Sequence, residues 1–514
     1  MVESHAEIPY YKLDVSHISL ALLVLGAYFT TINQLSYWIK EKLFLSSALV
    51  SLCLGIAFGP YGADIINPLE WVGRNAAAGR ALTFQLTRVL IGIQVMFAGI
   101  SLPAAYLRRE ALSLFVLLFP IMTIGWFVSA GFLKLFIPAI TYLEALVISA
   151  CITPTDPILA NAIVQGRYAE KYVPRSVRNM ISAESGANDG LGYPFLFIAI
   201  GLMHRSEESL GTVVAHWFVT TLLYQIMLSC AIGAVLGYIA RKSLKVAHTR
   251  RLIDHESFLA YGVGLSFLTL GVVGVLGSDD VFACFIAGNS LTWQDFFRIE
   301  TEDETFQDVI DSLLNASIFI YIGTIIDWSA YTSQYLTPWR MVLLALCLLA
   351  FRRLPWIVAL QKFIPAIPSH KQALFTGFFG PIGVSAIYYA ILAFNEVPEE
   401  RAVLRALIIP VVLFIAFSST LVHGISIPVS KFTYVAFERT RSTMSVTFSP
   451  AATARRRTNT APASPAASIH QVARSKAVAM PNIDSAPRRL TFQTEGTATP
   501  DSHTATPDSA SQVG

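Results

Sequence analysis

Two acidic residues interrupt an apolar stretch in the first half of the chain, where residues 183–194 read AESGANDGLGYP. Glu184 lies four residues before Asn188. Ser185 lies four residues before Asp189, so on a helix both pairs occupy adjoining faces that look the same way. A charge at the centre of a bilayer costs about 2.5–3.5 kcal/mol on insertion scales, so a carboxyl group there indicates a function. This stretch is the first candidate for a functional site.

The residue types in this stretch suit the binding of a proton or a small cation. Dry surroundings favour the protonated form of a carboxyl group, whereas a nearby cation favours the ionised form. Hard cations prefer oxygen ligands, so we predict a Na+ site made by Asp189, Ser185 and Thr155, with help from backbone carbonyls. One site that accepts either ligand and opens to two faces meets the requirement for exchange.

Two further apolar segments contain helix breakers. CITPTDPIL at 151–159 places Asp156 between two prolines, and FFGPIGVSA at 378–386 contains GPIG. Proline removes a helical hydrogen bond and clashes with the preceding turn, so both segments are predicted to unwind. They fall in the fifth and twelfth predicted spans, which cross the membrane in opposite directions. Paired interrupted helices in matched positions indicate the midplane site of an inverted-repeat transporter.

Glu184 needs a partner unless it carries the proton itself. Three basic residues lie in apolar segments, namely Arg88, Arg352 and Arg353. Buried charges usually persist when they are paired, so we favour a structural ion pair between Glu184 and Arg353, with Arg352 as the alternative partner.

Four other polar residues have two interpretations each. Asp156 either caps an open helix end or adds negative potential at the ion, and we predict that it is essential without being the principal ligand. Asp279 and Asp280, in LGSDDVFA, either attract cations or cap a helix. His423, in TLVHGISI, is more often a packed histidine than a proton sensor.

The composition of the whole chain indicates a membrane protein. Of its 514 residues, 54% are hydrophobic and 14% are charged, and the net charge of +3 gives no reason to expect nucleic-acid binding. The five cysteines show no paired spacing, so we expect no disulfide or zinc framework, and no cofactor. We predict an all-α polytopic membrane protein with thirteen transmembrane spans, at 18–38, 43–62, 82–102, 112–136, 143–164, 178–203, 212–240, 257–276, 280–293, 312–329, 340–361, 373–394 and 402–430.

The loops and the C-terminal segment predict the orientation. The loops on one side carry 16 basic residues against 8 on the other, which places the N-terminus outside and the tail in the cytoplasm. The loop at 294–311 is acidic and goes against this trend. Residues 1–442 are predicted to form the transmembrane exchanger domain. Residues 443–514, rich in Ser, Thr, Ala and Pro, are predicted to form a disordered cytoplasmic tail.

The motifs together resemble the fungal plasma-membrane sodium–proton antiporters (CPA1 type) of the monovalent cation–proton antiporter superfamily. The resemblance runs over about residues 13–432, and its motifs are TPTDP (153–157), AESGANDG (183–190), SDDVFACFIAG (278–288), RRLP (352–355), GPIGVSAIY (380–388) and LVHGISI (421–427). It implies the sodium–proton antiporter fold of thirteen helices, with inverted repeats, a dimerisation bundle and a core that contains the two discontinuous crossing helices. It also implies a homodimer in a lipid bilayer.

The resemblance also assigns roles to residues. The aspartate that carries the cation or proton falls on Asp189, and its asparagine neighbour falls on Asn188. The Thr-Asp of the crossing helix falls on Thr155 and Asp156, and the ligand serine falls on Ser185. The structural Glu–Arg pair falls on Glu184 and Arg353. The third span reads VMFAGISLP at 95–103 and lacks the acid that some relatives carry there, which leaves any contribution of that helix in doubt.

The leading functional hypothesis is a secondary transporter that exports Na+ and Li+ in exchange for external H+ at the plasma membrane, with K+ left open as a further substrate. The alternative is a K+/H+ exchanger of an endomembrane. A more remote hypothesis is an intramembrane aspartyl protease with Asp156 and Asp189 as its dyad, since paired carboxyls can share a proton. The flanking prolines and Asn188 argue against the protease.

Overall fold

The structure, a computed structural model, describes residues 17–35, 45–157, 159–160, 173–203, 209–301 and 304–447, without the side chains of residues 17, 33 and 427–447. Its first helices are α1 (His17–Thr31), η1 (Ile32–Leu35), α2 (Ser47–Phe58), α3 (Pro68–Trp71), α4 (Ala76–Ser101), α5 (Tyr106–Arg109), α6 (Ala111–Val116), η3 (Leu117–Ile121), α7 (Met122–Phe136), α8 (Tyr142–Cys151) and α11 (Arg175–Met203).

The remaining helices are α12 (Leu210–His216), η4 (Trp217–Met227), α13 (Leu228–Thr249), α14 (His255–Val275), α15 (Asp280–Leu291), α16 (Phe296–Glu300), α17 (Phe306–Ile325), η5 (Trp328–Thr332), α18 (Pro338–Phe351), α19 (Leu354–Leu360), η6 (Gln361–Phe363), α20 (His370–Phe378), α21 (Val384–Glu396) and α22 (Ala402–Thr447). Within the described residues the regular structure is helical and includes no strand, as the all-α prediction requires.

Each of the thirteen predicted spans contains at least one of these helices. Among the described residues, seven helical stretches are long and apolar enough to cross a membrane: Ala76–Ser101, Ala111–Phe136, Leu210–Thr249, His255–Val275, Phe306–Ile325, Pro338–Phe363 and Ala402–Ser426. Shorter apolar helices lie at Ile18–Thr31, Ser47–Phe58, Tyr142–Cys151 and Asp280–Leu291. The other two predicted spans contain α11 and the broken pair of α20 and α21.

Several helices extend beyond the predicted spans, and the tenth span is one example. It was expected to begin at residue 312, but α17 begins at Phe306. Asp308 and Asp311 therefore lie in the first turns of the helix and not in the acidic loop. Hydropathy alone excludes charged residues from a span, whereas the backbone hydrogen bonds of a helix can continue through them.

Local sequence explains where several helices start. The side chain of Asn75 accepts hydrogen bonds from the backbone of Ala77 and Ala78, at 3.0 and 3.2 Å, and so caps α4. Thr141 and Glu144 form a reciprocal capping box at the start of α8. These short polar residues satisfy backbone N–H groups that would otherwise have no partner.

Glycine allows the closest helix pairs to form. A Cβ added to Gly55 of α2 would overlap the backbone oxygen of Ile320 in α17. A Cβ added to Gly233 of α13 would overlap the backbone oxygen of Ala283 in α15. Small residues at such contacts let two backbones approach each other, which is the usual basis of helix association in membranes.

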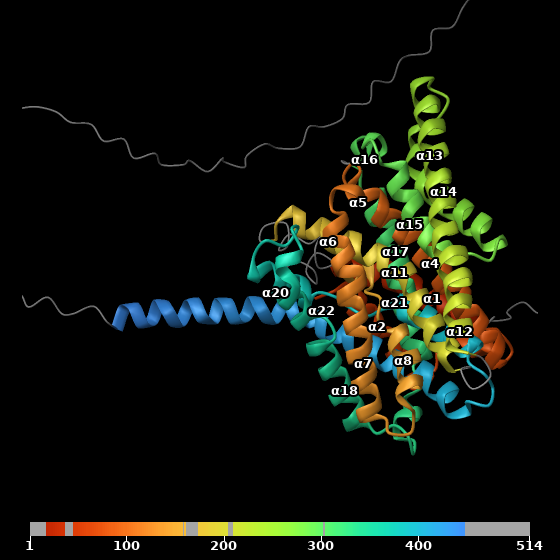
Figure 1. Cartoon of the computed structure of the whole chain (residues 1–514). Helices are drawn as coiled ribbons and strands as arrows, with labels where there is room; N and C mark the ends of the chain where they lie inside the picture. The colour runs from red at the N-terminus through yellow and green to blue at the C-terminus, as the bar shows by residue number, and fades with distance from the viewer. Residues whose placement is uncertain are drawn as a thin grey trace, which may run out of the picture. The chain divides into compact units, whose positions relative to one another are not determined.

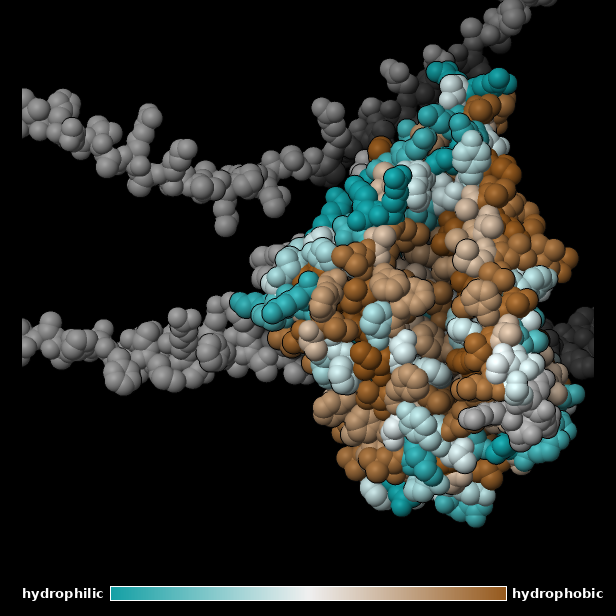
Figure 2. All heavy atoms as spheres, viewed as in Figure 1, coloured by the Kyte–Doolittle hydropathy of each residue, from teal (hydrophilic) through white to brown (hydrophobic). Residues whose placement is uncertain are grey.

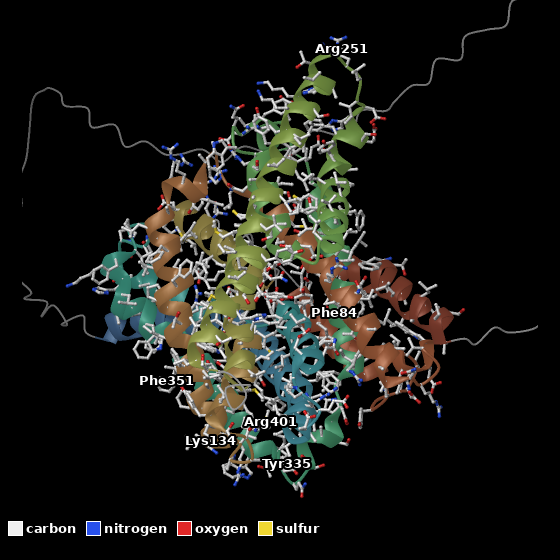
Figure 3. The ribbon with its side chains drawn as sticks, turned by 45° about the vertical axis from the view of Figure 1, so that its right-hand side comes forward. Phe84, Lys134, Arg251, Tyr335, Phe351 and Arg401 are labelled. Atoms are coloured by element: carbon white, nitrogen blue, oxygen red, sulfur yellow. The ribbon has the colours of Figure 1, made fainter. Side chains whose placement is uncertain are left out.

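The described loops lie at two opposite ends of the helical bundle. Arg251 lies at one end in Figure 3, and Lys134, Tyr335 and Arg401 lie at the other. This arrangement agrees with the division of the loops into two sets, since Arg251 belongs to the more basic set and Lys134 and Arg401 to the other. On the face seen in Figure 2, hydrophobic residues gather across the middle and hydrophilic residues toward the two ends.

Helix α22 extends to Thr447, beyond the predicted end of the transmembrane domain at residue 442. The rest of the predicted tail, from residue 448, lies outside the described residues, so its disorder stays a prediction. The five cysteines are free thiols.

Candidate cation-binding site

The fifth and twelfth spans are interrupted where the sequence predicts, and the two breaks touch each other. Helix α8 ends at Cys151, and α20 ends at Phe378 before α21 begins at Val384. The backbone N–H of Asp156 donates a hydrogen bond of 2.9 Å to the carbonyl of Pro381. The two unwound segments therefore cross in direct contact, and the prediction of two discontinuous crossing helices is confirmed.

Asp156 joins the two breaks through its side chain as well. Its Oδ1 accepts a hydrogen bond of 3.1 Å from the backbone of Leu159, and its Oδ2 accepts one of 2.6 Å from the backbone of Val384. The carboxylate thus meets the free N–H groups at the start of α21 and those on its own segment. Gly383 permits this approach, because a Cβ at that position would overlap Oδ2 of Asp156.

Arg352 occupies the complementary position at the helix C-termini. Its Nη1 donates to the carbonyls of Ile152, at 2.5 Å, and Thr153, at 3.0 Å, just beyond the end of α8. Its Nη2 donates to the carbonyl of Gly380, at 2.6 Å, just beyond the end of α20. The guanidinium therefore satisfies carbonyl groups freed on both unwound segments, and it is not the partner of Glu184.

Sequence reasoning missed this role of Arg352. A signal for it exists, because two unwound segments in an apolar region leave several carbonyls without donors and arginine offers five N–H groups. The carbonyls freed by the two breaks need hydrogen-bond donors, and the arginines of the eleventh span can supply them.

Glu184 and Arg353 form a two-pronged ion pair between α11 and the start of α19. Nη1 of Arg353 contacts Oε1 of Glu184, and Nη2 donates to Oε2 at 2.7 Å. The side chains are 3% and 9% exposed, for Glu184 and Arg353 respectively, so water contributes little to their solvation. Nε of Arg353 also donates to the carbonyl of Thr376 in α20, at 3.2 Å. The pair therefore links α11 to the region around the crossing.

Asn188 connects α11 directly to the crossing. Its Oδ1 accepts a hydrogen bond of 3.0 Å from the backbone of Thr155, and its Nδ2 donates to Oγ1 of Thr155 at 2.8 Å. The hydroxyls of Thr155 and Ser185 lie 3.1 Å apart. The structure therefore brings Asn188, Thr155 and Ser185 together, and Thr155 and Asn188 line one cavity with Glu184 and Arg353.

Asp189 is the exception among these polar groups. It is 1% exposed, and neither of its carboxyl oxygens accepts a hydrogen bond. The hydroxyl of Ser385 in α21 is close enough to interact with the carboxyl group but does not reach hydrogen-bond geometry. Tyr389 donates to the backbone oxygens of Asp189 and Gly190, at 2.5 and 3.1 Å, and so leaves the carboxyl group open.

An isolated buried carboxylate is among the most costly arrangements in a protein, because its charge loses hydration without compensation. Binding a proton removes the charge, and binding a cation balances it. The arrangement around Asp189 therefore supports either ligand and strongly disfavours the empty, ionised state. Ser385 and Tyr389, which sequence reasoning did not single out, complete its surroundings.

Asp279 and Asp280 behave differently, although they are adjacent. Oδ2 of Asp280 accepts a hydrogen bond of 2.6 Å from Nε of Arg88, so this residue and Arg88 form a partly buried ion pair between α15 and α4. Oδ1 of Asp279 caps α15 by accepting from the backbone of Phe282 at 2.9 Å. The Oδ2 atom of Asp279 is buried without a hydrogen-bond partner. Asp279 thus combines the capping interpretation with a free oxygen, whereas Asp280 is paired.

His423 packs against the end of α20. Its Nδ1 lies 2.8 Å from the carbonyl of Ser419 and its Nε2 lies 3.0 Å from the carbonyl of Phe378. Only 2% of the residue is exposed. These contacts fit the interpretation of a packed histidine that holds α22 against the twelfth span.

A change at Arg352 is expected to destabilise the crossing. Arg352→Gln removes charged donors from buried carbonyls, each contributing about 1.5–3 kcal/mol, so the thermal unfolding temperature of the purified protein should fall by several degrees. Arg352→Lys keeps the charge but offers only three donors from one nitrogen, so its unfolding temperature should fall less than that of Arg352→Gln. Arg251→Gln, at an exposed loop position, is the matched control. Equal unfolding temperatures for Arg352→Gln and the control would contradict the role assigned to Arg352.

Two crossed, interrupted helices with a buried, unpartnered carboxyl group beside them define the class of sodium–proton antiporter-fold membrane proteins. A family model described as the transmembrane sodium/hydrogen exchanger matches residues 28–430. The chain belongs to this sodium/hydrogen exchanger family, in agreement with the resemblance of its motifs.

Fungal proteins are similar to the chain over most of its length. It is 39% identical over 435 residues to a probable Na+/H+ antiporter of Schizosaccharomyces pombe, a match covering 81% of this chain and 56% of that protein. It is 35% identical to an Na+/H+ antiporter of Saccharomyces cerevisiae, covering 81% of this chain and 44% of that protein. The chain thus spans about half the length of these two relatives. A second Na+/H+ antiporter of S. pombe is 33% identical, covering 81% of this chain and 91% of that protein.

A solved structure shows the same fold. The sodium proton antiporter MjNhaP1 from Methanocaldococcus jannaschii, determined at pH 8, matches with a TM-score of 0.59 and 17% identity. The match covers 79% of this chain and 96% of that chain. At this level of identity the likeness concerns the fold alone.

Proposed function

We propose that the chain is a secondary active antiporter that exchanges intracellular Na+ for extracellular H+ and binds each in turn at Asp189. The observation that carries the proposal is the Asp189 carboxyl group, which is 1% exposed and accepts no hydrogen bond on either oxygen. The relatives named as Na+/H+ antiporters support the choice of ions.

In this proposal, the cost of an empty, ionised site couples the two ion movements. The empty, ionised carboxylate would have to move through the protein without compensation, which costs several kcal/mol. The loaded forms, with a proton or a cation at Asp189, carry no such penalty. The protein therefore changes the side to which the site opens only when Asp189 holds a proton or a cation. Each outward passage of Na+ then requires the return of a proton.

The surrounding residues have supporting roles in this proposal. Ser185 and Thr155 supply hydroxyl oxygens next to the crossing, and Ser185 shares its face of α11 with Asp189. Asp156 and Arg352 hold the unwound segments together, so that freed carbonyls and helix ends stay near the ion. The Glu184–Arg353 pair keeps α11 in register with the crossing.

The finer parts of the proposal concern substrates and location. We include Li+ as a substrate and leave K+ open, place the protein in the plasma membrane as a homodimer, and put its N-terminus outside and its tail in the cytoplasm. The distribution of basic residues between the two sets of loops supports this orientation. The alternative, a K+/H+ exchanger of an endomembrane, shares the same site and differs in cation preference.

Transport by the full chain in liposomes tests the function. The purified protein is reconstituted with a fluorescent pH indicator inside an acid-loaded lumen, and NaCl, LiCl, KCl or choline chloride is then added outside. We expect NaCl and LiCl to drive proton efflux and choline chloride to have no effect. A response to KCl alone would favour the alternative exchanger. Identical traces for all four salts would refute cation–proton exchange, and an aspartyl protease would give that result.

A further inference from the structure

A second group of polar side chains lies between α4 and α17, apart from the crossing. Nε2 of Gln94 in α4 donates a hydrogen bond of 3.2 Å to Oδ1 of Asn315 in α17. Asp311 lies four residues before Asn315, so the two side chains stack on one face of α17. Gln94 is only 5% exposed, in the same third span whose contribution the sequence left in doubt.

Oxygen atoms in this group lack donors. In the part of the chain that the structure describes, Oε1 of Gln94 and Oδ1 of Asp311 are both shielded from solvent and accept no hydrogen bond. The carboxamide of Gln94 is oriented by its bond to Asn315, so its free oxygen belongs to the same polar group. Buried acceptors without donors cost free energy unless a proton or a cation visits them.

The group extends toward Asp189. A Cβ added to Gly186 of α11 would lie 3.2 Å from Cβ of Ala98 in α4, so these two turns are in contact. Gln94 is one turn before Ala98 on α4, and the third and sixth spans run in opposite directions. Gln94 therefore lies beside the next turn of α11, which carries Asp189. Figure 1 shows α4, α11 and α17 together in the centre of the bundle.

The other end of the group points to one face of the membrane. Because α17 begins at Phe306, Asp311 lies in its second turn and Asn315 in its third. The loop before α17 belongs to the set that the proposed orientation assigns to the cytoplasm. The oxygens of Asp311, Asn315 and Gln94 therefore form a series from the cytoplasmic end of α17 to the level of Asp189.

We propose that Asp311, Asn315 and Gln94 form a second, transient binding site for the transported alkali cation, on the cytoplasmic route to Asp189. The ligands are one carboxylate and two carboxamides, which suit a hard monovalent cation. A path that conducts ions needs sites that are weak and multiple, so that each ion can leave for the next. This inference rests on the proposed antiport function and adds the route by which the cation arrives.

Transport kinetics test the route. Asp311→Asn should raise the Na+ concentration for half-maximal exchange at the cytoplasmic face about tenfold, the effect of one charge in partly buried surroundings, and retain exchange at saturating Na+. Gln94→Met keeps the side-chain volume and removes the oxygen, so it should also raise the Na+ concentration for half-maximal exchange. Asp308→Asn, one turn earlier and exposed, is the matched control and should stay within about twofold of the wild type. If the half-maximal Na+ concentration of Asp311→Asn stays within about twofold of the wild-type value, the proposal is overturned.

Cation binding without transport separates this inference from the proposed function. The thermal unfolding temperature of purified Asp189→Asn is measured in NaCl and in choline chloride of equal concentration. We expect a sodium-specific increase that disappears in Asp189→Asn combined with Asp311→Asn. Absence of that increase in Asp189→Asn would overturn the second site even if the wild type exchanges ions. If the wild type showed no exchange while the increase persisted, the antiport function would fail and the second site would remain.

Discussion

Asp189→Asn is expected to abolish sodium-coupled proton movement without harming the folded protein. Asparagine has nearly the same shape as aspartate, but its amide neither takes up a proton at neutral pH nor balances the charge of a cation. The carboxyl group of Asp189 accepts no hydrogen bond, so its removal breaks no contact of that group. Replacement of a buried carboxyl group that has no hydrogen-bond partner should leave the unfolding temperature unchanged or raise it.

Two measurements on one preparation check this prediction. Sodium-driven proton efflux from liposomes should fall to the level of protein-free liposomes, while thermal unfolding in detergent should match or exceed that of the wild type. The exposed change Asp308→Asn provides a matched control that should retain exchange. Exchange that survives in Asp189→Asn would show that another group carries the proton, and the proposed mechanism would then be wrong.

Arg353→Ala is expected to cause a large loss of stability. It leaves the carboxylate of Glu184, whose side chain is 3% exposed, without its charged partner. Removing one member of a buried ion pair typically lowers the free energy of unfolding by about 3–5 kcal/mol. The measurement is the unfolding temperature of the purified variant in detergent, compared with that of the wild type.

The double variant Glu184→Gln with Arg353→Met distinguishes a lost pair from a lost arginine. With both charges removed, no uncompensated carboxylate remains, so we expect the double variant to recover much of the stability lost in Arg353→Ala. If it is no more stable than Arg353→Ala, the two residues act separately, and the structural role of the pair is refuted. Exchange activity in the double variant would further show that neither charge carries the proton.

These two predictions depend on the same contrast between partnered and unpartnered charges. Glu184 and Asp189 are one and a half helical turns apart on α11, and both are buried. Glu184 has an arginine against both of its carboxyl oxygens, whereas the carboxyl group of Asp189 has neither a base nor a hydrogen-bond donor. A partnered carboxylate is suited to hold structure, and an unpartnered one is suited to exchange its ligand. Sequence position alone does not separate these roles.

Much of the fold follows from local patterns. Apolar length predicts each span, because a helix of about 20 residues is needed to cross about 30 Å of hydrocarbon. The prolines around Asp156 and the GPIG sequence predict the two interruptions, because proline cannot complete the helical hydrogen bonds. The acidic residues of the sixth span are also recognisable from sequence, because a charge in hydrocarbon is costly and indicates either a function or a partner.

Other features depend on contacts between distant parts of the chain. Arg352 and Arg353 are neighbours in the sequence, yet one binds carbonyls of both unwound segments and the other binds Glu184. Asp279 and Asp280 likewise diverge, because only Asp280 faces Arg88 of α4. Each pair lies at a helix boundary, where the backbone changes direction: Arg352 follows α18 and Arg353 precedes α19, and Asp279 precedes α15. Neighbouring side chains therefore point to different segments, and their partners depend on which segments pack on each side.

Composition and periodicity thus define the class of the chain, its spans and the polar residues that lie within them. The sequence is sufficient for this because the cost of burying a polar group depends on the residue itself and on its local segment. The tertiary structure decides which of those residues are satisfied. It pairs Glu184, Asp280 and both arginines of the eleventh span, and it leaves oxygens of Asp189, Gln94 and Asp311 without donors. That distinction arises from long-range packing, in which the orientation of a few helices determines where donors meet acceptors.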